Sequence, residues 1–86
     1  LTPYDPSVVT SLSEIRRANL ATVLRELEAD GVSSLREQAD ILGTSERVVE
    51  AILKGNSIDD ALAREIEWSA HKPVYWMDED NKGTPL

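Results

Sequence analysis

Residues 38 to 55, QADILGTSERVVEAILKG, are the stretch that decides the fold of this chain. Apolar residues recur at helical spacing on both sides of Gly43, which predicts one helix from about Leu35 to Leu42 and a second from about Ser45 to Lys54. Gly43 can adopt the positive φ that turns the chain between them. Two helices joined by so short a turn cross at a steep angle, so we expect the second helix to project from the domain surface.

Small and branched side chains form the framework predicted for this helix pair. Ala39 is small enough to let the helices cross closely, and Val49 and Ile52 are expected to anchor the second helix from beneath. The residues expected to face outward from the second helix are Ser45, Glu46, Arg47, Glu50, Ala51 and Lys54.

Further helical patterns flank this pair. One runs from Ser11 to about Asp30, with its apolar residues on one broad face, and another runs from about residue 58 to residue 71, where Pro73 ends it. Residues 74–78, VYWMD, predict a short additional turn of helix that places Trp76 against the bundle. No stretch shows a strand pattern that competes with these helices.

Capping boxes mark three of the predicted helix starts. A serine followed three residues later by an acidic residue satisfies backbone N–H groups at an open helix end, and the acid suits the positive end of the helix dipole. The pairs are Ser11 with Glu14, Ser34 with Glu37, and Ser57 with Asp60.

The core is expected to be mostly aliphatic, because the chain has two Trp, two Tyr and no Phe. Arg16 falls within the apolar stripe of the first helix, where its stem would cover the core while the guanidinium reaches water. The side chains expected to point inward are Leu12, Ile15, Leu20, Val23, Leu24, Leu27, Leu35, Ala39, Leu42, Val49, Ile52, Leu53, Leu62, Ile66 and Ala70.

These patterns predict an all-α fold, a compact bundle of four or five helices in a single domain that covers residues 11–77. Residues 1–10 contain two prolines and no helical period, so we expect an extended N-terminal arm. Residues 78–86 are expected to form an acidic, frayed C-terminal tail.

Composition excludes several classes of protein. The chain has no cysteine for disulfides or thiolate metal sites, and no apolar run approaches the roughly 18 residues of a membrane span. His71, the only histidine, has no sequence partner for a metal or acid–base site, and its expected role is helix capping. We therefore expect no enzyme activity, no metal and no cofactor. The chain begins with Leu1 and shows no basic-then-apolar leader, so we expect a cytoplasmic protein.

Charge gives a mixed indication about partners. Nine Lys and Arg against sixteen Asp and Glu leave a net charge of −7, which opposes non-specific binding to nucleic acid. Residues 33–54 are closer to neutral, with three basic and four acidic side chains, a local charge of −1: Arg36, Arg47 and Lys54 against Glu37, Asp40, Glu46 and Glu50.

Residues 34–71, and more loosely 13–77, resemble the lambda-repressor-like helix-turn-helix family of phage and bacterial regulators. The resemblance rests on the A-D-x-x-G pattern from Ala39 to Gly43, on the Val49 and Ile52 anchors, and on the L-K-G at residues 53–55. Further similarity lies in the IRRANL, ARxIE and WMD segments at residues 15–20, 63–67 and 76–78.

The resemblance implies a sequence-specific DNA-binding transcription regulator, a repressor, whose helix at residues 45–54 enters the major groove. It also implies a homodimer on double-stranded DNA. Trp68 lies off the inward face of its helix, which indicates either a dimer contact or a side chain that fills the core locally. The implied base contacts are Ser45, Glu46, Arg47, Glu50 and Lys54, and the implied phosphate contacts are Arg17, Arg36, Gln38 and Thr44.

Two other interpretations remain open from the sequence. The cations Arg36, Arg47 and Lys54 would in one of them only pair with nearby carboxylates on a solvated face. In the other, the chain is a protein-interaction module whose acidic surface binds a basic protein partner without contacting DNA.

Overall fold

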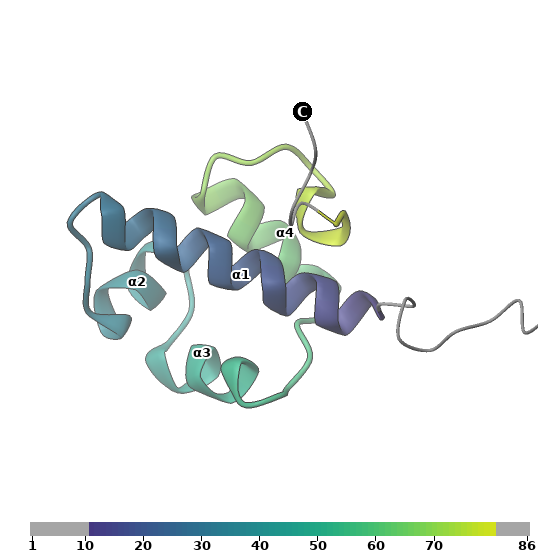
Figure 1. The fold of residues 1–86 in the computed structure, drawn as a ribbon, viewed down its shortest axis with the longest axis horizontal. Helices are drawn as coiled ribbons and strands as arrows, with labels where there is room; N and C mark the ends of the chain where they lie inside the picture. Colours follow the sequence, from purple (N-terminus) through teal and green to yellow (C-terminus); the bar gives the residue numbers. More distant parts are fainter. Residues whose placement is uncertain (1–10, 81–86) are drawn as a thin grey trace, which may run out of the picture.

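The computed structural model describes residues 11–80, which form four α-helices and one 3₁₀ helix and contain no β-strand (Figure 1). The elements are α1 (Leu12–Ala29), α2 (Leu35–Ile41), α3 (Glu46–Leu53), α4 (Asp60–Ser69) and the 3₁₀ helix η1 (Trp76–Asp78). The predicted all-α fold is confirmed for this part of the chain. The predicted arm, residues 1–10, and residues 81–86 of the predicted tail lie outside the described residues.

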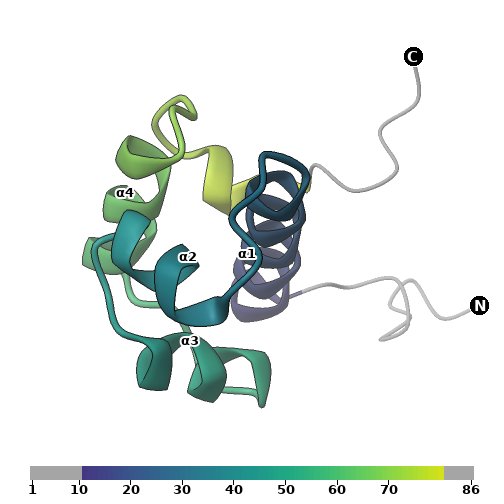
Figure 2. The same cartoon turned by 90° about the vertical axis from the view of Figure 1, so that its left-hand side faces the viewer.

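The long helix α1 runs through the middle of the domain in Figure 1, with α2 and α3 on one side of it and α4 with η1 on the other. In Figure 2, α1 lies at the right of the domain, and α4, α2 and α3 follow one another from top to bottom on its left, so α3 is again at the edge of the molecule. This arrangement leaves one whole side of α3 without a neighbouring helix.

Side-chain caps begin the helices, as the sequence predicts for α1 and α2. Ser11 forms a full capping box with Glu14, and the Ser34 hydroxyl accepts from the Glu37 backbone N–H at 3.1 Å. The predicted capping box of Ser57 with Asp60 at the start of α4 is wrong. Its cap is Asp59, whose carboxylate accepts from the Leu62 backbone N–H at 2.8 Å.

The later start of α4 has a tertiary cause. Ile58, which was expected at the start of this helix, lies in the non-helical segment before it, where its side chain is buried in the core and its carbonyl accepts a 2.8 Å hydrogen bond from Arg16. The Ser57 hydroxyl lies 3.1 Å from the hydroxyl of Ser13 on α1.

All four α-helices end in the same backbone motif, in which a left-handed residue follows the C-cap. Glycine occupies this position after α1, α2 and α3, but His71 occupies it after α4, with φ of 60°. The next N–H, that of Lys72, donates to the Glu67 carbonyl at 2.8 Å and closes the motif. His71 therefore ends the helix as predicted, through its backbone and at a steric cost that glycine avoids.

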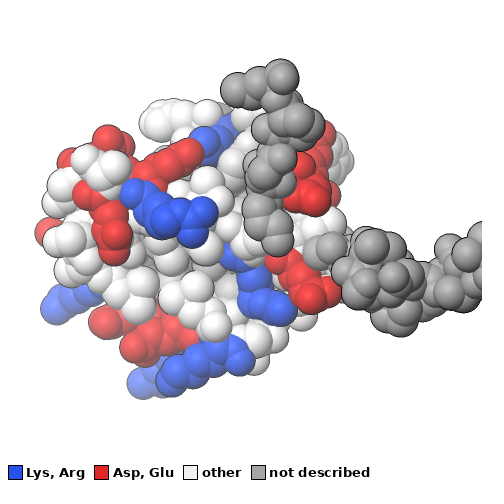
Figure 3. Space-filling view, in the orientation of Figure 1, with Lys and Arg blue, Asp and Glu red and all other residues white. Residues whose placement is uncertain are grey.

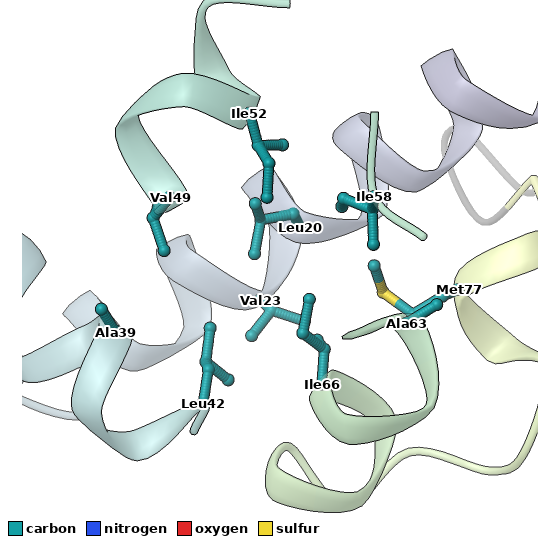
Figure 4. Close-up of a cluster of buried hydrophobic side chains, with 10 residues drawn as sticks. All are labelled: Leu20, Val23, Ala39, Leu42, Val49, Ile52, Ile58, Ala63, Ile66 and Met77. Carbon is teal, nitrogen blue, oxygen red and sulfur yellow. The ribbon is translucent and has the colours of Figure 1, made fainter. Parts of the chain in front are cut away.

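One hydrophobic core joins all the elements (Figure 4). Met77 of η1 is fully buried in it, a contribution that the sequence did not indicate. Leu12 and Leu53, expected inside, are 46% and 49% exposed because they lie at the ends of their helices, past the neighbours that would cover them. The buried members are Leu20, Val23, Ala39, Leu42, Val49, Ile52, Ile58, Ala63, Ile66 and Met77.

An ionic cluster fastens η1 to α1 and α4, and two predictions fail here. The guanidinium of Arg16 does not reach water: its Nε donates to Asp78 at 2.7 Å and its Nη2 to Asp60 at 2.8 Å. Asp78 also accepts from Arg64 at 3.0 Å, so it belongs to the folded domain and not to a frayed tail. We define the ionic cluster as Arg16, Asp60, Arg64, Glu67 and Asp78.

Buried polar groups complete the attachment of η1. The carboxylate of Glu67, which is 2% exposed, accepts from the Met77 backbone N–H at 2.8 Å. The side-chain amide of Asn19 donates to the backbone carbonyls of Met77 and Glu79, each at 2.8 Å. Because these groups satisfy one another inside the domain, they are not available to an external partner.

Candidate nucleic-acid interface

The helix α3 separates its side chains into a buried and an exposed set. Val49 and Ile52 are 1% and 2% exposed and face the core, as the sequence predicts. The opposite side is open to solvent along the edge of the molecule (Figures 1 and 2). The predicted base-contact residues are all exposed there: Ser45, Glu46, Arg47, Glu50 and Lys54.

The turn before α3 fixes how the helix projects. Gly43 has φ of 77°, and the next N–H, that of Thr44, donates back to the Ala39 carbonyl at 3.0 Å. A Cβ atom at Gly43 would lie 2.7 Å from a carboxylate oxygen of Glu65 on α4, so the turn also passes close to that helix. The Ser45 hydroxyl then accepts from the Val48 N–H at 3.3 Å and starts α3.

The cations of α2 and α3 lack carboxylate partners. Arg36, Arg47 and Lys54 are exposed, and none of them takes part in a salt bridge within residues 11–80. The salt-bridged cations among residues 11–80 lie outside α2 and α3, at Arg16, Arg64 and Lys72. The interpretation in which nearby carboxylates pair with the cations of this surface is therefore not supported there.

Arg17 of α1 lies next to the C-terminal end of α3. Its Nη1 donates to the Ser13 hydroxyl at 3.0 Å and approaches the Gly55 carbonyl at 3.4 Å. This places a fourth cation next to the backbone of Gly55, the residue that follows Lys54, although Arg17 and Gly55 are far apart in the sequence. The predicted phosphate contacts Arg17 and Arg36 thus lie on the elements that border α3.

Acidic side chains share this surface. Glu46 and Glu50 are exposed on α3, on either side of Arg47 in the sequence. Figure 3 shows basic and acidic side chains interspersed over one face, including the lower edge where α3 lies. Such a surface gives a polyanion no continuous basic path, so recognition has to depend on individual contacts.

Gln38 does not lie where the predicted phosphate contact requires. Its side chain is 3% exposed, and its Nε2 donates to the Val32 carbonyl at 2.8 Å, so it holds the loop between α1 and α2. Thr44, the other predicted phosphate contact near the turn, is half-buried.

The sequence did not indicate two apolar side chains on the exposed part of α3, Val48 and Leu53. An apolar side chain in the major groove can contact a thymine methyl group.

Trp68 is exposed to solvent. Its side chain is 80% exposed on α4, which agrees with its predicted position off the inward face.

Residues 11–80 contain no group of His, Asp or Glu side chains that could hold a metal ion. Within the same residues, no helix has the length and apolar character needed to cross a membrane.

Comparisons with protein-family models, with curated proteins and with solved structures find no match to this chain.

Proposed function

We propose that this protein is a sequence-specific regulator of transcription that binds double-stranded DNA, with α2 and α3 acting as a lambda-repressor-like helix-turn-helix. In this proposal α3 enters the major groove and occupancy of the site represses transcription, without chemistry on the DNA. The observation that carries it is the exposed side of α3 together with Arg36, Arg47 and Lys54, which have no salt-bridge partner within residues 11–80.

The residue types on α3 suit base recognition. Arg47 can donate two hydrogen bonds to the edge of a guanine, and the carboxylates of Glu46 and Glu50 can accept from the N4 amino group of cytosine. The cations at Arg36 and Lys54 suit phosphate oxygens on either side of the groove.

Electrostatics favours selective over generic binding. The whole chain carries a charge of −7, and carboxylates held near phosphates oppose every duplex alike. Only a duplex whose base edges satisfy Arg47 and the acidic side chains compensates for that repulsion. One subunit supplies few cations for phosphate contacts, so stable occupancy at physiological salt requires two subunits.

Selection from random duplexes at low salt tests the proposal. We expect one half-site motif to be enriched, and Arg47→Ala to abolish the enrichment while the circular dichroism spectrum stays unchanged. Arg25→Ala is the matched control, because Arg25 is exposed on α1 and, among residues 11–80, its one side-chain hydrogen bond goes to the Thr22 hydroxyl at 3.1 Å. Its loss should leave the motif intact. If Arg25→Ala abolished enrichment as fully as Arg47→Ala, α3 would not be the reading element.

The acidic surface supports a second candidate, an interaction module that binds a basic protein and never contacts DNA. Glu28 and Asp30 are exposed at the C-terminal end of α1, whereas Asp78 is engaged in the ionic cluster. Absence of any enriched duplex, together with a basic partner whose binding is lost in Glu28→Gln and Asp30→Asn, would favour this function.

A further inference from the structure

Trp68 is more exposed than any other large hydrophobic side chain among residues 11–80, at 80%. Val74 and Tyr75, a few residues later in the chain, are also exposed. A tryptophan side chain in water leaves about 150–250 Å² of mostly apolar surface unburied, and such surfaces mark sites of association.

The two aromatic side chains that follow Trp68 have partners within the domain. The Nζ of Lys72 lies 4.7 Å from the centroid of a Trp76 ring, and the Arg64 guanidinium lies 4.5 Å from the centroid of the Tyr75 ring. Within residues 11–80, Trp68 has no ring contact of this kind. Its exposure is therefore not compensated by the fold.

The surface next to Trp68 is hollowed and carries opposite charges. A hollow there is lined by Glu65, Trp68, Ser69, His71 and Lys72. Glu65 precedes Trp68 by about one helical turn, and Lys72 follows it by about the same number of residues. The lining thus contains one acidic and one basic side chain, and Lys72 also lies 3.0 Å from Glu26 within the same subunit.

We propose that this surface binds a second copy of the same chain through a two-fold interface. In this interface, the Trp68 side chain of each subunit enters the hollow next to Trp68 of the partner subunit. A two-fold interface requires a surface that is complementary to itself. A protruding indole and a hollow on one face meet that requirement in shape. Antiparallel apposition also meets it in charge, because it brings Glu65 against Lys72 of the partner subunit.

This interface would supply the second subunit that the proposed DNA binding requires. Its argument rests on the proposed function only in that requirement. In both Figure 1 and Figure 2, α4 lies at the top of the domain and α3 at the bottom. A dimer formed through α4 therefore leaves both copies of α3 open to DNA.

Sedimentation equilibrium of the full chain, without DNA, tests the interface. We expect a concentration-dependent dimer whose dissociation constant rises at least about 30-fold in Trp68→Ala, as for a central tryptophan in an interface. Leu12→Ala is the control, because Leu12 is an exposed apolar residue on α1, and its change should stay below about 3-fold. Circular dichroism verifies that both variants fold.

Charge reversal tests the apposition itself. Glu65→Lys alone and Lys72→Glu alone should each weaken the dimer, since each places like charges together at both contacts. An equimolar mixture of the two variants should restore it, because both contacts become attractive in the mixed dimer. This mixture also controls for loss of the 3.0 Å contact between Lys72 and Glu26, which Lys72→Glu removes in every case.

A chain that stays monomeric at millimolar concentration, a dimer that Trp68→Ala does not weaken, or single variants that do not recover on mixing would overturn the inference. The outcome is separate from that of duplex selection. A dimer with these properties and no enriched duplex would support the interface and reject DNA binding, and an enriched half-site with a permanent monomer would do the reverse.

Discussion

Asp78→Asn is predicted to destabilise the domain by about 2–3 kcal/mol, because it removes the charge at the centre of the ionic cluster. The carboxylate of Asp78 lies 2.7 Å from Nε of Arg16 and 3.0 Å from Nη2 of Arg64, and its side chain is 22% exposed. The Arg16 side chain is 5% exposed, so its charge cannot turn to water.

The remaining partners of Arg16 set the magnitude. Breaking a buried ion pair costs about 3–5 kcal/mol when the remaining charge has no other partner. Arg16 keeps its hydrogen bonds to the Ile58 carbonyl and to Asp60, which lowers the cost. Asp60 compensates little, because its side chain is 88% exposed and its charge is screened by water.

The cluster also predicts how stability depends on pH. Hydrogen bonds from Arg16, and then from Arg64, outweigh burial and hold the pKa of Asp78 below its ordinary value of 3.8. A carboxylate with a lowered folded-state pKa contributes its stability above the unfolded-state value and loses it as pH falls through the folded-state value. The difference between the wild-type protein and Asp78→Asn should therefore be constant near neutral pH and shrink below about pH 3.8.

Urea denaturation followed by circular dichroism at pH 7 and at pH 3 measures both effects. In a thermal melt, the expected loss of about 2–3 kcal/mol in the free energy of unfolding corresponds to a melting temperature lower by about 10–20 °C for a domain of this size. Asp40→Asn, an exposed carboxylate on α2 outside every salt bridge of residues 11–80, should change stability by less than about 0.5 kcal/mol. An Asp78→Asn variant as stable as Asp40→Asn, or a difference that persists unchanged at pH 3, would refute the reasoning.

Three further changes test other parts of the structure. His71→Gly should raise the free energy of unfolding by about 0.5–1 kcal/mol, since glycine adopts a φ of 60° without the steric cost of a side chain, and lower stability in urea would contradict this. Met77→Ala should cost about 2–5 kcal/mol by leaving a cavity in the core, and a loss under 1 kcal/mol would mean that η1 is not docked. Glu50→Gln should raise affinity for generic duplex about 5-fold at low salt if the side chain faces phosphates, whereas Glu28→Gln on α1 should not; equal effects would indicate only the change in net charge.

The sequence alone specified the features of this protein that depend on neighbouring residues. Helical spacing predicted four helices and the two sides of α3, and Gly43 marked the turn because its positive φ is a local requirement. The capping residues Ser11 and Ser34 were found for the same reason, since a cap bonds to a backbone group three residues away. The exposed cations of α3 followed directly from the buried positions of Val49 and Ile52.

Only the tertiary structure decided which polar groups meet. Spacing shows that Arg16 lies on the inward stripe of α1, but its partner Asp78 is 62 residues away, and no local pattern links the two. Gln38 was predicted from the family resemblance to contact a phosphate, but its side chain is held inside by the Val32 carbonyl of the preceding loop, which the resemblance did not indicate. Periodicity assigns a side chain to a face, whereas burial and pairing depend on what the rest of the chain brings against that face.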